Sequence, residues 1–271
     1  MGYRLLVSDV DGTLVDKEKR LSPATIAAVK RLEAAGVRFT IISARPKSGM
    51  EPIAEALAID GPMAAFNGGL IWHRDGTVDE HHVIDPEVAR GVFDCIGTLA
   101  VDIWVFADDC WYSSTDRGVH VEHERVASDQ TEVVTPDFAG LLDRADKITF
   151  VSDDPPTLAA LHARIDARYA GRATVAQSQT YYLDITALEA NKGRGIEALA
   201  AAAGVPLART VAIGDQANDL PMLARAGLSI AMGNAPAVVQ EAAAHVTRAN
   251  DADGVAHAID TLILPALEQP K

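Results

Sequence analysis

Two acidic side chains, Asp9 and Asp11, stand one residue apart directly after the apolar run 5–7. Two carboxylates about 4 Å apart repel each other by roughly 4 kcal/mol at an effective dielectric near 20, so both stay ionised only beside a cation. Magnesium suits them, because it takes a few oxygen ligands and keeps several waters and a substrate phosphate. The alternative is a solvated turn, for which an Asp-Gly pair such as 11–12 is a common signal.

Polar residues also follow two other predicted strands. They are Ser43 and Arg45 after one strand, and Asp215, Asn218 and Asp219 after another. In an open parallel sheet, ligands bind outside the carboxyl ends of the strands, so these residues are expected to share one pocket with Asp9 and Asp11. A solvated turn would not explain a matching acidic cluster after a second strand. An EF-hand is excluded, because Gly12 comes too early and Arg20 occupies the position of its bidentate Glu.

Lys192 is expected in the first turn of a helix, where the helix dipole disfavours a positive charge. A bound anion would offset that mismatch. A phosphate held by helix amides, the Ser43 hydroxyl and the Lys192 ammonium is therefore one interpretation. The other interpretation is an exposed lysine at a mildly unfavourable position. Lys192 alone does not favour a phosphate site; the other motifs taken together with it do.

The elements that must position these side chains alternate between strand and helix at both ends of the chain. A helix is predicted over 22–36, opened by a Ser-Pro pair and closed by glycine. The β-branched run 37–46 follows, and a second helix is predicted over 46–59. The last third repeats the scheme with strands at 209–215, 228–233 and 245–250, each followed by an Ala-rich helix. This alternation predicts an α/β fold with a parallel sheet.

The middle of the chain has a different pattern. Its predicted elements are a helix over 86–100, two strands within 101–114 around a tight turn at Asp108 and Asp109, a strand near 146–152, a helix over 156–170 and two further strands. This α+β order predicts a second domain inserted into the first. The predicted boundaries assign 1–82 and 187–271 to the core and 83–186 to the insertion, with Trp104 and Trp111 in the core of the insertion.

The composition narrows the class of protein. The chain has 271 residues, 48% of them hydrophobic, and a net charge of -14, which argues against a broad nucleic-acid-binding surface. No apolar run approaches the roughly 18 residues of a membrane span, and the start lacks a signal peptide. Cys95 and Cys110 have neither CxxC spacing nor the count of a disulfide framework. A cytoplasmic protein without membrane or nucleic-acid partners is expected.

Four segments in chain order resemble the motifs of the haloacid dehalogenase-like hydrolase superfamily. They are DVDGTL, IISAR, NKG and GDQANDLPML. The segments AFNGGLI, YYLDITALEANKGRGIEAL and SIAMGNAPAVVQEAAAHVTRANDADGVAHAI further resemble its Cof-type subfamily. That subfamily carries a large α/β cap of type IIB between the second and third motifs. The resemblance therefore implies a Rossmann-like core with an inserted cap, which matches the insertion inferred from the element pattern.

The resemblance also implies roles for individual positions. Asp9 matches the nucleophile that forms an aspartyl phosphate, and Asp11 matches the general acid and base. The implied magnesium ligands are Asp9, the backbone carbonyl of Asp11, and Asp215. The implied phosphate-binding groups are Ser43, Lys192, Asn218 and the amides of Val10 and Ala44. The implied supporting residues are Thr13, Arg45, Asn67 and Asp219.

One position departs from the subfamily pattern, which usually reads Thr-Gly-Arg where this chain reads Ser43-Ala44-Arg45. Serine keeps the hydroxyl, and the added Cβ of Ala44 is expected to be tolerated.

Two further sequence signals are weaker. Asn67 precedes a glycine, as in many turns. His120, Glu122 and His123 stand close together without a clear helix, so they favour a polar loop over a second metal site or a substrate-reading surface.

These observations predict a magnesium-dependent phosphatase with a small phosphorylated substrate, either a sugar phosphate or a phosphorylated cofactor. Two alternatives remain. A phosphomutase on the same scaffold would return the phosphoryl group to the sugar. A sugar-phosphate sensor would keep the pocket without turnover. Neither the substrate nor the oligomeric state can be deduced from the sequence.

Overall fold

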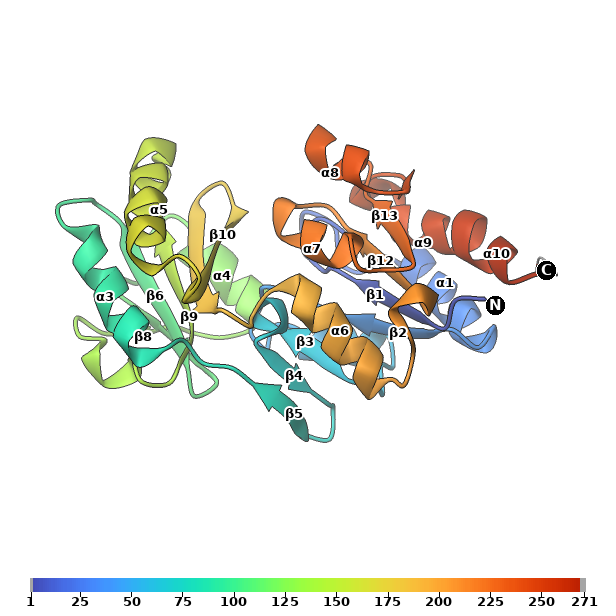
Figure 1. The fold of residues 1–271 in the computed structure, drawn as a ribbon, viewed down its shortest axis with the longest axis horizontal. Coiled ribbons are helices and arrows are strands. Elements are labelled where there is room, and N and C mark those ends of the chain that lie inside the picture. Colours follow the sequence, from blue (N-terminus) through green and yellow to red (C-terminus); the bar gives the residue numbers. More distant parts are fainter. Residues whose placement is uncertain (1, 269–271) are drawn as a thin grey trace.

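The computed structural model describes residues 2–268. Figure 1 shows two lobes, with the N- and C-terminal segments together in one and the middle of the chain in the other. We call the first lobe the core and the second the cap. The predicted α/β core with an inserted α+β cap is confirmed by the two separate sheets, one parallel and one largely antiparallel.

The core sheet has five parallel strands in the order β14-β13-β12-β1-β2. They are β1 (Leu5–Ser8), β2 (Arg38–Ile41), β12 (Thr210–Gly214), β13 (Leu228–Ala231) and β14 (His245–Val246). Leu6 packs on one face of the sheet, while Leu5 and Val7 pack on the other. Helices therefore cover both faces, which explains why these strands are apolar throughout rather than alternating with polar residues.

The helices of the core divide between the two faces. One face is covered by α1 (Pro23–Ala34), α2 (Glu51–Ala56), α9 (Gly254–Ala258) and the π-helical turn Ile259–Ile263, which continues into α10 (Leu264–Glu268). The other face is covered by α6 (Lys192–Ala202), α7 (Leu220–Leu223) and α8 (Ala237–Ala242). The predicted start of α1 is confirmed, because the Ser22 hydroxyl accepts a hydrogen bond from the amide of Thr25. Met222 of α7 is buried in the core.

The second predicted helix is shorter than expected. The pattern predicted helix over 46–59, whereas α2 spans only Glu51–Ala56. The preceding residues form a loop that contacts the cap: the Ser48 hydroxyl donates to the Ser128 carbonyl at 2.5 Å, and Gly49 lies against Ala127. Contacts with another domain therefore fix the conformation of this segment, and local periodicity does not record them.

A small antiparallel sheet extends the core beside β2. It consists of β3 (Met63–Ala65), β4 (Leu70–Trp72) and β5 (Val78–His81), and a bridge between Ile42 and Ala64 joins it to the end of β2. The segment 66–68 forms a 3-10 turn between β3 and β4. The sequence did not predict this sheet, because its strands are only three or four residues long.

The cap is built on a six-stranded sheet with the order β10-β11-β9-β6-β7-β8. The strands are β6 (Asp102–Ala107), β7 (Cys110–Ser113), β8 (Val133–Val134), β9 (Ala145–Val151), β10 (Ala173–Gln179) and β11 (Tyr182–Ala187). Asp108 and Asp109 both have a positive φ in the turn between β6 and β7, which confirms the predicted tight turn. The domain limits of 83 and 186 stay a prediction, although all six strands lie between 102 and 187.

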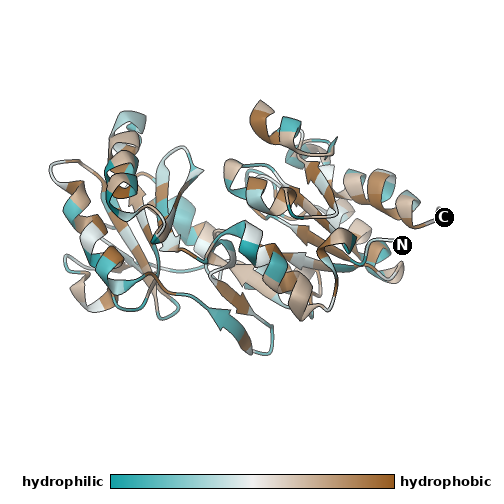
Figure 2. Ribbon diagram, viewed as in Figure 1, coloured by the Kyte–Doolittle hydropathy of each residue, from teal (hydrophilic) through white to brown (hydrophobic). Residues whose placement is uncertain are grey.

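The two faces of the cap sheet have different partners. Helices α3 (Pro86–Ile96) and α5 (Pro155–Tyr169) pack on the face away from the core. Helix α4 (Val121–Ser128) lies on the other face, with Trp104 and Trp111 buried beside it. The expectation of an irregular polar loop at 120–124 is wrong, because α4 begins there. Figure 2 shows hydrophobic residues along strands of the core, whereas β5 at its edge is hydrophilic.

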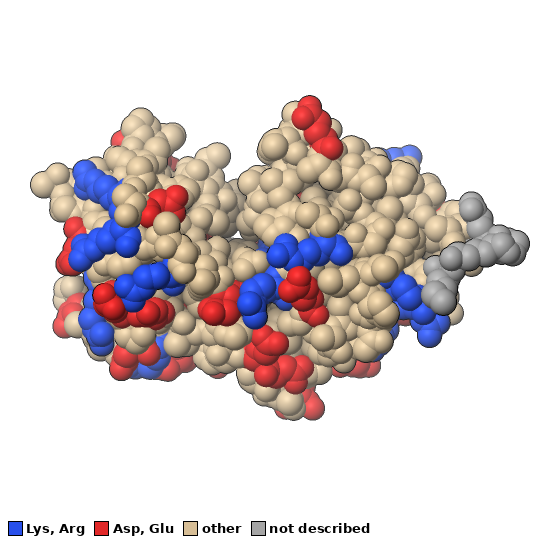
Figure 3. Space-filling view, in the orientation of Figure 1, with Lys and Arg blue, Asp and Glu red and all other residues tan. Residues whose placement is uncertain are grey.

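The surface is of mixed charge. On the face drawn in Figure 3, most of the Lys and Arg side chains lie beside Asp and Glu side chains. Among residues 2–268, no helix is long and apolar enough to cross a membrane. Cys95 is buried and Cys110 is exposed, and both are free thiols.

One ion pair crosses the junction between the core and the cap. His81, at the end of β5, places Nε2 at 2.5 Å from Oδ1 of Asp146, which is buried in β9. The hydrogen bond to Asp146 raises the pKa of His81 above its usual value, despite partial burial. The charged histidine is therefore stabilised in the folded protein. Its contribution is complete below the pKa of the unfolded state and is lost as the pH rises through the higher pKa of the folded state.

We expect His81→Gln to lower the free energy of unfolding at pH 6 and to have a smaller effect at pH 9. The difference should be at most about 1 kcal/mol, because the imidazole is half exposed and the pair is screened by solvent. Urea unfolding at the two pH values measures it, with His245→Gln on the exposed strand β14 as the control. An equal loss at both pH values would show that the charge of His81 is not involved.

Candidate active site

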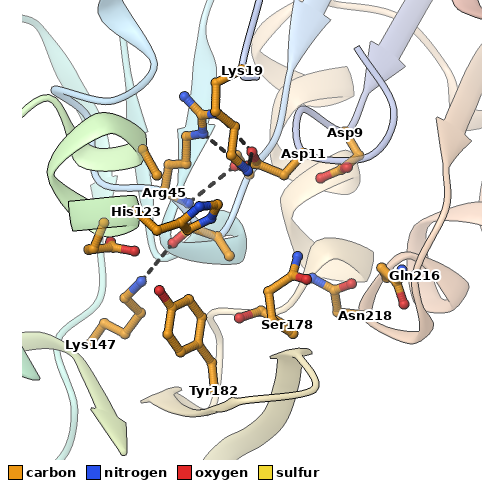
Figure 4. Close-up of a pocket in the computed structure, with 15 residues that line it drawn as sticks. Asp9, Asp11, Lys19, Arg45, His123, Lys147, Ser178, Tyr182, Gln216 and Asn218 are labelled. Atoms are coloured by element: carbon orange, nitrogen blue, oxygen red, sulfur yellow. Dashed lines mark hydrogen bonds and ion pairs between the residues drawn. The ribbon is translucent and has the colours of Figure 1, made fainter. Parts of the chain in front are cut away.

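A pocket lies between the carboxyl ends of the core strands and the face of the cap that carries α4 (Figure 4). Asp9 and Asp11 follow β1, Ser43 follows β2, and the loop after β12 adds Gln216 and Asn218. The predicted meeting of these strand ends is therefore observed. Parallel strands bring their ends to one edge of the sheet, where the chain leaves the hydrogen-bonded ladder and the side chains are free to turn toward a ligand.

A buried charge cluster forms the floor of the site. The ammonium of Lys192 donates to Oδ1 of Asp9 and, at 2.5 Å, to Oδ1 of Asp219. Lys192 is only 2% exposed, so the alternative of an exposed lysine is wrong. Burial alone would lower the pKa of Lys192, but the two carboxylates outweigh it and raise the pKa above its usual value. Lys192 is therefore a permanent cation at the start of α6.

Asp215 is fixed by the loops around it. Its Oδ1 accepts from the Thr13 hydroxyl at 3.0 Å, and its Oδ2 accepts from the Gln216 amide at 3.1 Å. Oδ2 of Asp219 accepts from the amides of Asp215 and Gln216, both at 2.8 Å. Burial and the nearby Asp219 charge raise the pKa of Asp215 to about 6, and burial raises that of Asp9 as well. This site thus concentrates more negative charge than its single lysine balances.

Asp11 points away from this cluster and toward Arg45 and Lys19, as Figure 4 shows. Arg45 binds it with two parallel hydrogen bonds of 2.7 Å, and Lys19 donates to it at 2.5 Å. Burial would raise the pKa of Asp11, but the hydrogen bonds and charges of Arg45 and Lys19 outweigh it and hold the pKa well below its usual range. The two acids of the opening motif therefore have different environments.

The predicted phosphate-binding positions surround the space beside Asp9. Among the hydrogen bonds recorded for residues 2–268, none is donated by the amides of Val10 or Ala44. The Ser43 hydroxyl accepts from the Arg45 amide at 3.1 Å, and the Asn218 amide donates to Asn67 Oδ1 at 3.2 Å. Ala44 is not among the residues with a positive φ, so the backbone accommodates its Cβ, in line with the expected tolerance.

Asn67 lies in a buried turn beside the pocket. It is 4% exposed and has φ 60°, which is the conformation of a tight turn. Its amide donates to the Ser43 carbonyl at 2.7 Å, and its side chain orients Asn218. The turn therefore positions Asn218 at the edge of the pocket.

The cap supplies the opposite wall. His123 and Glu124 come from α4, Lys147 from β9, Ser178 and Gln179 from β10, and Tyr182 from β11. The three residues suspected of forming a second metal site have separate environments: His120 pairs with Asp153, Glu122 pairs with Arg125, and His123 faces the pocket. His123 thus fits the alternative of a substrate-reading surface.

Comparison with known proteins decides the family. A profile described as haloacid dehalogenase-like hydrolase matches residues 6–259, nearly the whole chain. The chain belongs to the haloacid dehalogenase-like hydrolase family.

Several relatives extend this hydrolase assignment over the full length. A Bacillus subtilis protein named 5-amino-6-(5-phospho-D-ribitylamino)uracil phosphatase is 28% identical and covers 96% of this chain and 98% of its own. A haloacid dehalogenase-like hydrolase from Bacteroides thetaiotaomicron has a TM-score of 0.84 at 29% identity, covering 95% and 98% of the two chains. A sugar phosphatase of subclass IIB, 22% identical, has a TM-score of 0.81 over 95% and 98%. That last likeness confirms the fold of core and cap.

The donor set of this hydrolase fits a magnesium ion. Oxygen atoms of Asp9, Asp215 and Asp219 lie within 4.8 Å of one another, and all three residues are buried. These three carboxylates face one ammonium, so a divalent cation would balance the remaining charge. The predicted set named the carbonyl of Asp11 in place of Asp219. Oxygens of all three carboxylates accept hydrogen bonds from protein groups, and Asp219 differs in that it binds both Lys192 and the backbone of the Asp215 loop.

Some site residues of the hydrolase were not predicted. Lys19, Gln216 and the cap residues Glu124, Lys147 and Tyr182 line the pocket, although the sequence analysis gave none of them a role. Gln216 and Tyr182 lie within segments that carry the family resemblance, whereas Lys19 and Lys147 lie outside them. Asn234 was also missed, and its side-chain amide donates to the Gly12 carbonyl at 2.8 Å. Asn234 lies within SIAMGNAP, a segment that carries the family resemblance, but its contact with Gly12 could not be deduced from the sequence.

Gly12, in the loop after β1, lies against Asp215 in the loop after β12. Its φ is +80°, and a Cβ added there would overlap Oδ2 of Asp215. We expect Gly12→Ala to lower the free energy of unfolding by about 2–4 kcal/mol, the sum of backbone strain and displacement of Asp215. Gly36→Ala is the matched control, because Gly36 has φ +81° and nothing within 4 Å of the added Cβ. Equal losses in urea unfolding would mean that the Asp215 contact has no energetic consequence.

Proposed function

We propose that this hydrolase is a magnesium-dependent phosphatase that acts on a small phosphorylated metabolite through an aspartyl-phosphate intermediate. The observation that carries the proposal is the position of Asp9. Its carboxylate lines the pocket, is bound by the buried Lys192 and lies within 4.8 Å of Asp215. A nucleophile, a fixed cation and a site for a divalent metal thus meet at one strand end.

Asp9 would attack phosphorus, so that an O–P bond forms to its carboxylate as the bond to the leaving oxygen breaks. Lys192 holds the carboxylate in place, and the free amides of Val10 and Ala44 with the Ser43 hydroxyl would receive the phosphoryl oxygens. Asn218, oriented by Asn67, would bind a further oxygen. These donors are fixed before substrate binds, which reduces the cost of reorganisation in the transition state.

Asp11 would transfer the protons. In the first step it protonates the leaving oxygen, and in the second it accepts a proton from the water that breaks the bond between phosphorus and Asp9. Arg45 and Lys19 hold Asp11 as a carboxylate, which is the form that the second step requires. Donating a proton in the first step requires Asp11 to leave this ion pair, and substrate entering beside Arg45 would bring about that change.

Magnesium, held by Asp9 and Asp215 with the Asp11 carbonyl, would shield the attacking carboxylate from the charge of the phosphate. Asp219 then serves as a positioning residue, because it binds Lys192 and the two amides of the Asp215 loop. Thr13 fixes Asp215 from the opposite side. We further propose that the cap, 83–186, moves as a unit to admit the substrate and to close over it.

The names of relatives support a small substrate. One relative is named a 5-amino-6-(5-phospho-D-ribitylamino)uracil phosphatase, and the subclass IIB neighbour is named a sugar phosphatase. We extend this class, a sugar phosphate or a phosphorylated cofactor, to this chain. We include no nucleic-acid or membrane partner in the proposal.

The test is phosphate release from a panel of sugar phosphates and phosphorylated cofactors, with magnesium and with a chelator in excess. We expect release with magnesium and a loss of at least about 100-fold with the chelator, restored by added magnesium. Isomerised sugar phosphate without free phosphate would indicate a mutase instead. Binding of the panel without any turnover would indicate a sensor.

A further inference from the structure

The cap wall of the pocket carries polar groups that the protein itself does not satisfy. Glu124, Lys147 and Tyr182 are 5%, 6% and 6% exposed, and all three line the pocket. Folding normally pairs such groups or replaces them by apolar ones, because an unpaired buried polar group is costly. Their retention at this wall points to a ligand that completes them.

The partners of each group show how much hydrogen-bonding capacity is left. Lys147 donates to the Ala44 carbonyl at 3.1 Å, which leaves two of its three donors, and its ammonium lies 4.4 Å from the centre of the Phe106 ring. Burial and the neighbouring Glu124 carboxylate raise the pKa of the Tyr182 hydroxyl, which forms no well-aligned hydrogen bond. Apart from this tyrosine, the Glu124 carboxylate has no hydrogen-bond or ion-pair partner among residues 2–268. One wall therefore presents free acceptors, free donors and a hydroxyl.

The position of these groups corresponds to the leaving group of the substrate. The phosphate site is beside Asp9, and the leaving oxygen must lie within reach of Asp11. The charges of Asp11 and Arg45 act on Glu124, and Lys147 contacts the main chain next to Arg45. Figure 4 shows the Lys147 and Tyr182 side chains extending from the cap into the same space as His123 and Arg45. The cap groups therefore face the part of the substrate attached to the leaving oxygen.

The chemistry of the wall selects among leaving groups. A hydroxyl both donates and accepts, so two neighbouring hydroxyls can donate to Glu124 and accept from Lys147 at the same time. An alkyl chain, in contrast, would leave both side chains unpaired.

We propose that Glu124 and Lys147 are specificity-determining residues that bind adjacent hydroxyl groups of the leaving alcohol, so that phosphate monoesters of polyols and sugars are preferred. The inference rests on the phosphatase function proposed above. Tyr182 supplies the third contact, to a hydroxyl further along the carbon chain.

The experiment compares two esters of equal chain length, glucitol 6-phosphate and hexyl phosphate, with the full-length protein and magnesium. We expect wild type to favour glucitol 6-phosphate in kcat/KM by at least about 100-fold, because a site built for hydroxyls discriminates strongly against their absence. Glu124→Leu and Lys147→Met should each lower kcat/KM for glucitol 6-phosphate by about 10–100-fold and change that for hexyl phosphate by less than about 3-fold. Glu124→Gln, which keeps an acceptor, should retain part of the preference.

Matched control variants replace residues of the same charge outside the pocket. Glu122→Gln alters the exposed acid two residues away on α4, and Lys30→Met alters an exposed lysine on α1. Neither should change the ratio of kcat/KM for the two esters.

Equal rates for both esters in wild type would overturn the inference and leave the phosphatase function intact. An equal fall for both esters in the Glu124 and Lys147 variants would also overturn it, because those residues would then act on the chemistry. Release of phosphate from neither ester, nor from any other phosphate ester, would overturn the proposed function and this inference together.

Discussion

Replacing Asp9 by Asn should reduce phosphate release by at least about 10⁴-fold, because the amide is a poor nucleophile and no covalent intermediate can form. The fold should be retained. Asp9 is a buried carboxylate whose pKa is raised by burial and by its acidic neighbours, so a neutral residue of the same shape removes an electrostatic cost. Initial rates with magnesium and a saturating phosphate ester provide the measurement.

The control for this variant is its stability. Urea unfolding of Asp9→Asn should agree with wild type within about 1 kcal/mol, so that loss of activity cannot be assigned to unfolding. Lys192 keeps Asp219 as a partner in the variant, which limits any rearrangement. Turnover within ten-fold of wild type would exclude Asp9 as the nucleophile.

Lys192→Met should affect both stability and activity. The substitution leaves Asp9 and Asp219 buried without their shared cation, and removing one partner of a buried pair costs about 3–5 kcal/mol. Loss of a fixed positive group beside the transferring phosphoryl should lower kcat by at least about 100-fold. Urea unfolding and steady-state kinetics measure the two effects, with the exposed Lys30→Met as the control.

A second substitution separates the electrostatic cause from simple loss of packing. If unpaired carboxylates destabilise Lys192→Met, adding Asp9→Asn should recover about 1–2 kcal/mol of the lost stability, since one buried charge is then removed. Purely additive losses in the double variant would show that the methionine fails for steric reasons. Activity should remain absent in the double variant in either case.

Much of the core half of the site could be predicted from the sequence. Asp9, Asp11, Ser43 and Asp215 directly follow apolar strands, and the geometry of a parallel sheet alone brings such positions together. Lys192 was recognisable as a cation in an unfavourable place at a helix start. The structure explains that placement by two carboxylates on neighbouring loops, to which the predicted phosphate would be added.

The cap half could not be predicted in the same way. Glu124 and Lys147 come from a helix and a strand that are distant in sequence, and no local pattern predicts that both side chains line the same pocket as Arg45. The segment 120–124 was expected to be irregular because its charged residues obscure the helical periodicity of α4. Similarly, the loop before α2 follows its contacts with Ala127 and Ser128 rather than its own propensity. Tertiary contacts therefore determine the conformation of both segments.

The formation of an aspartyl phosphate is the step on which the proposed function depends most directly. The measurement is mass spectrometry of peptides from enzyme quenched in acid during turnover of a hydrolysed phosphate ester. We predict the mass of one added phosphoryl group on the peptide that contains Asp9, present in wild type with magnesium and absent in Asp9→Asn. Steady turnover with no phosphorylated Asp9 at any quench time, or the same modification in Asp9→Asn, would contradict covalent catalysis by this residue.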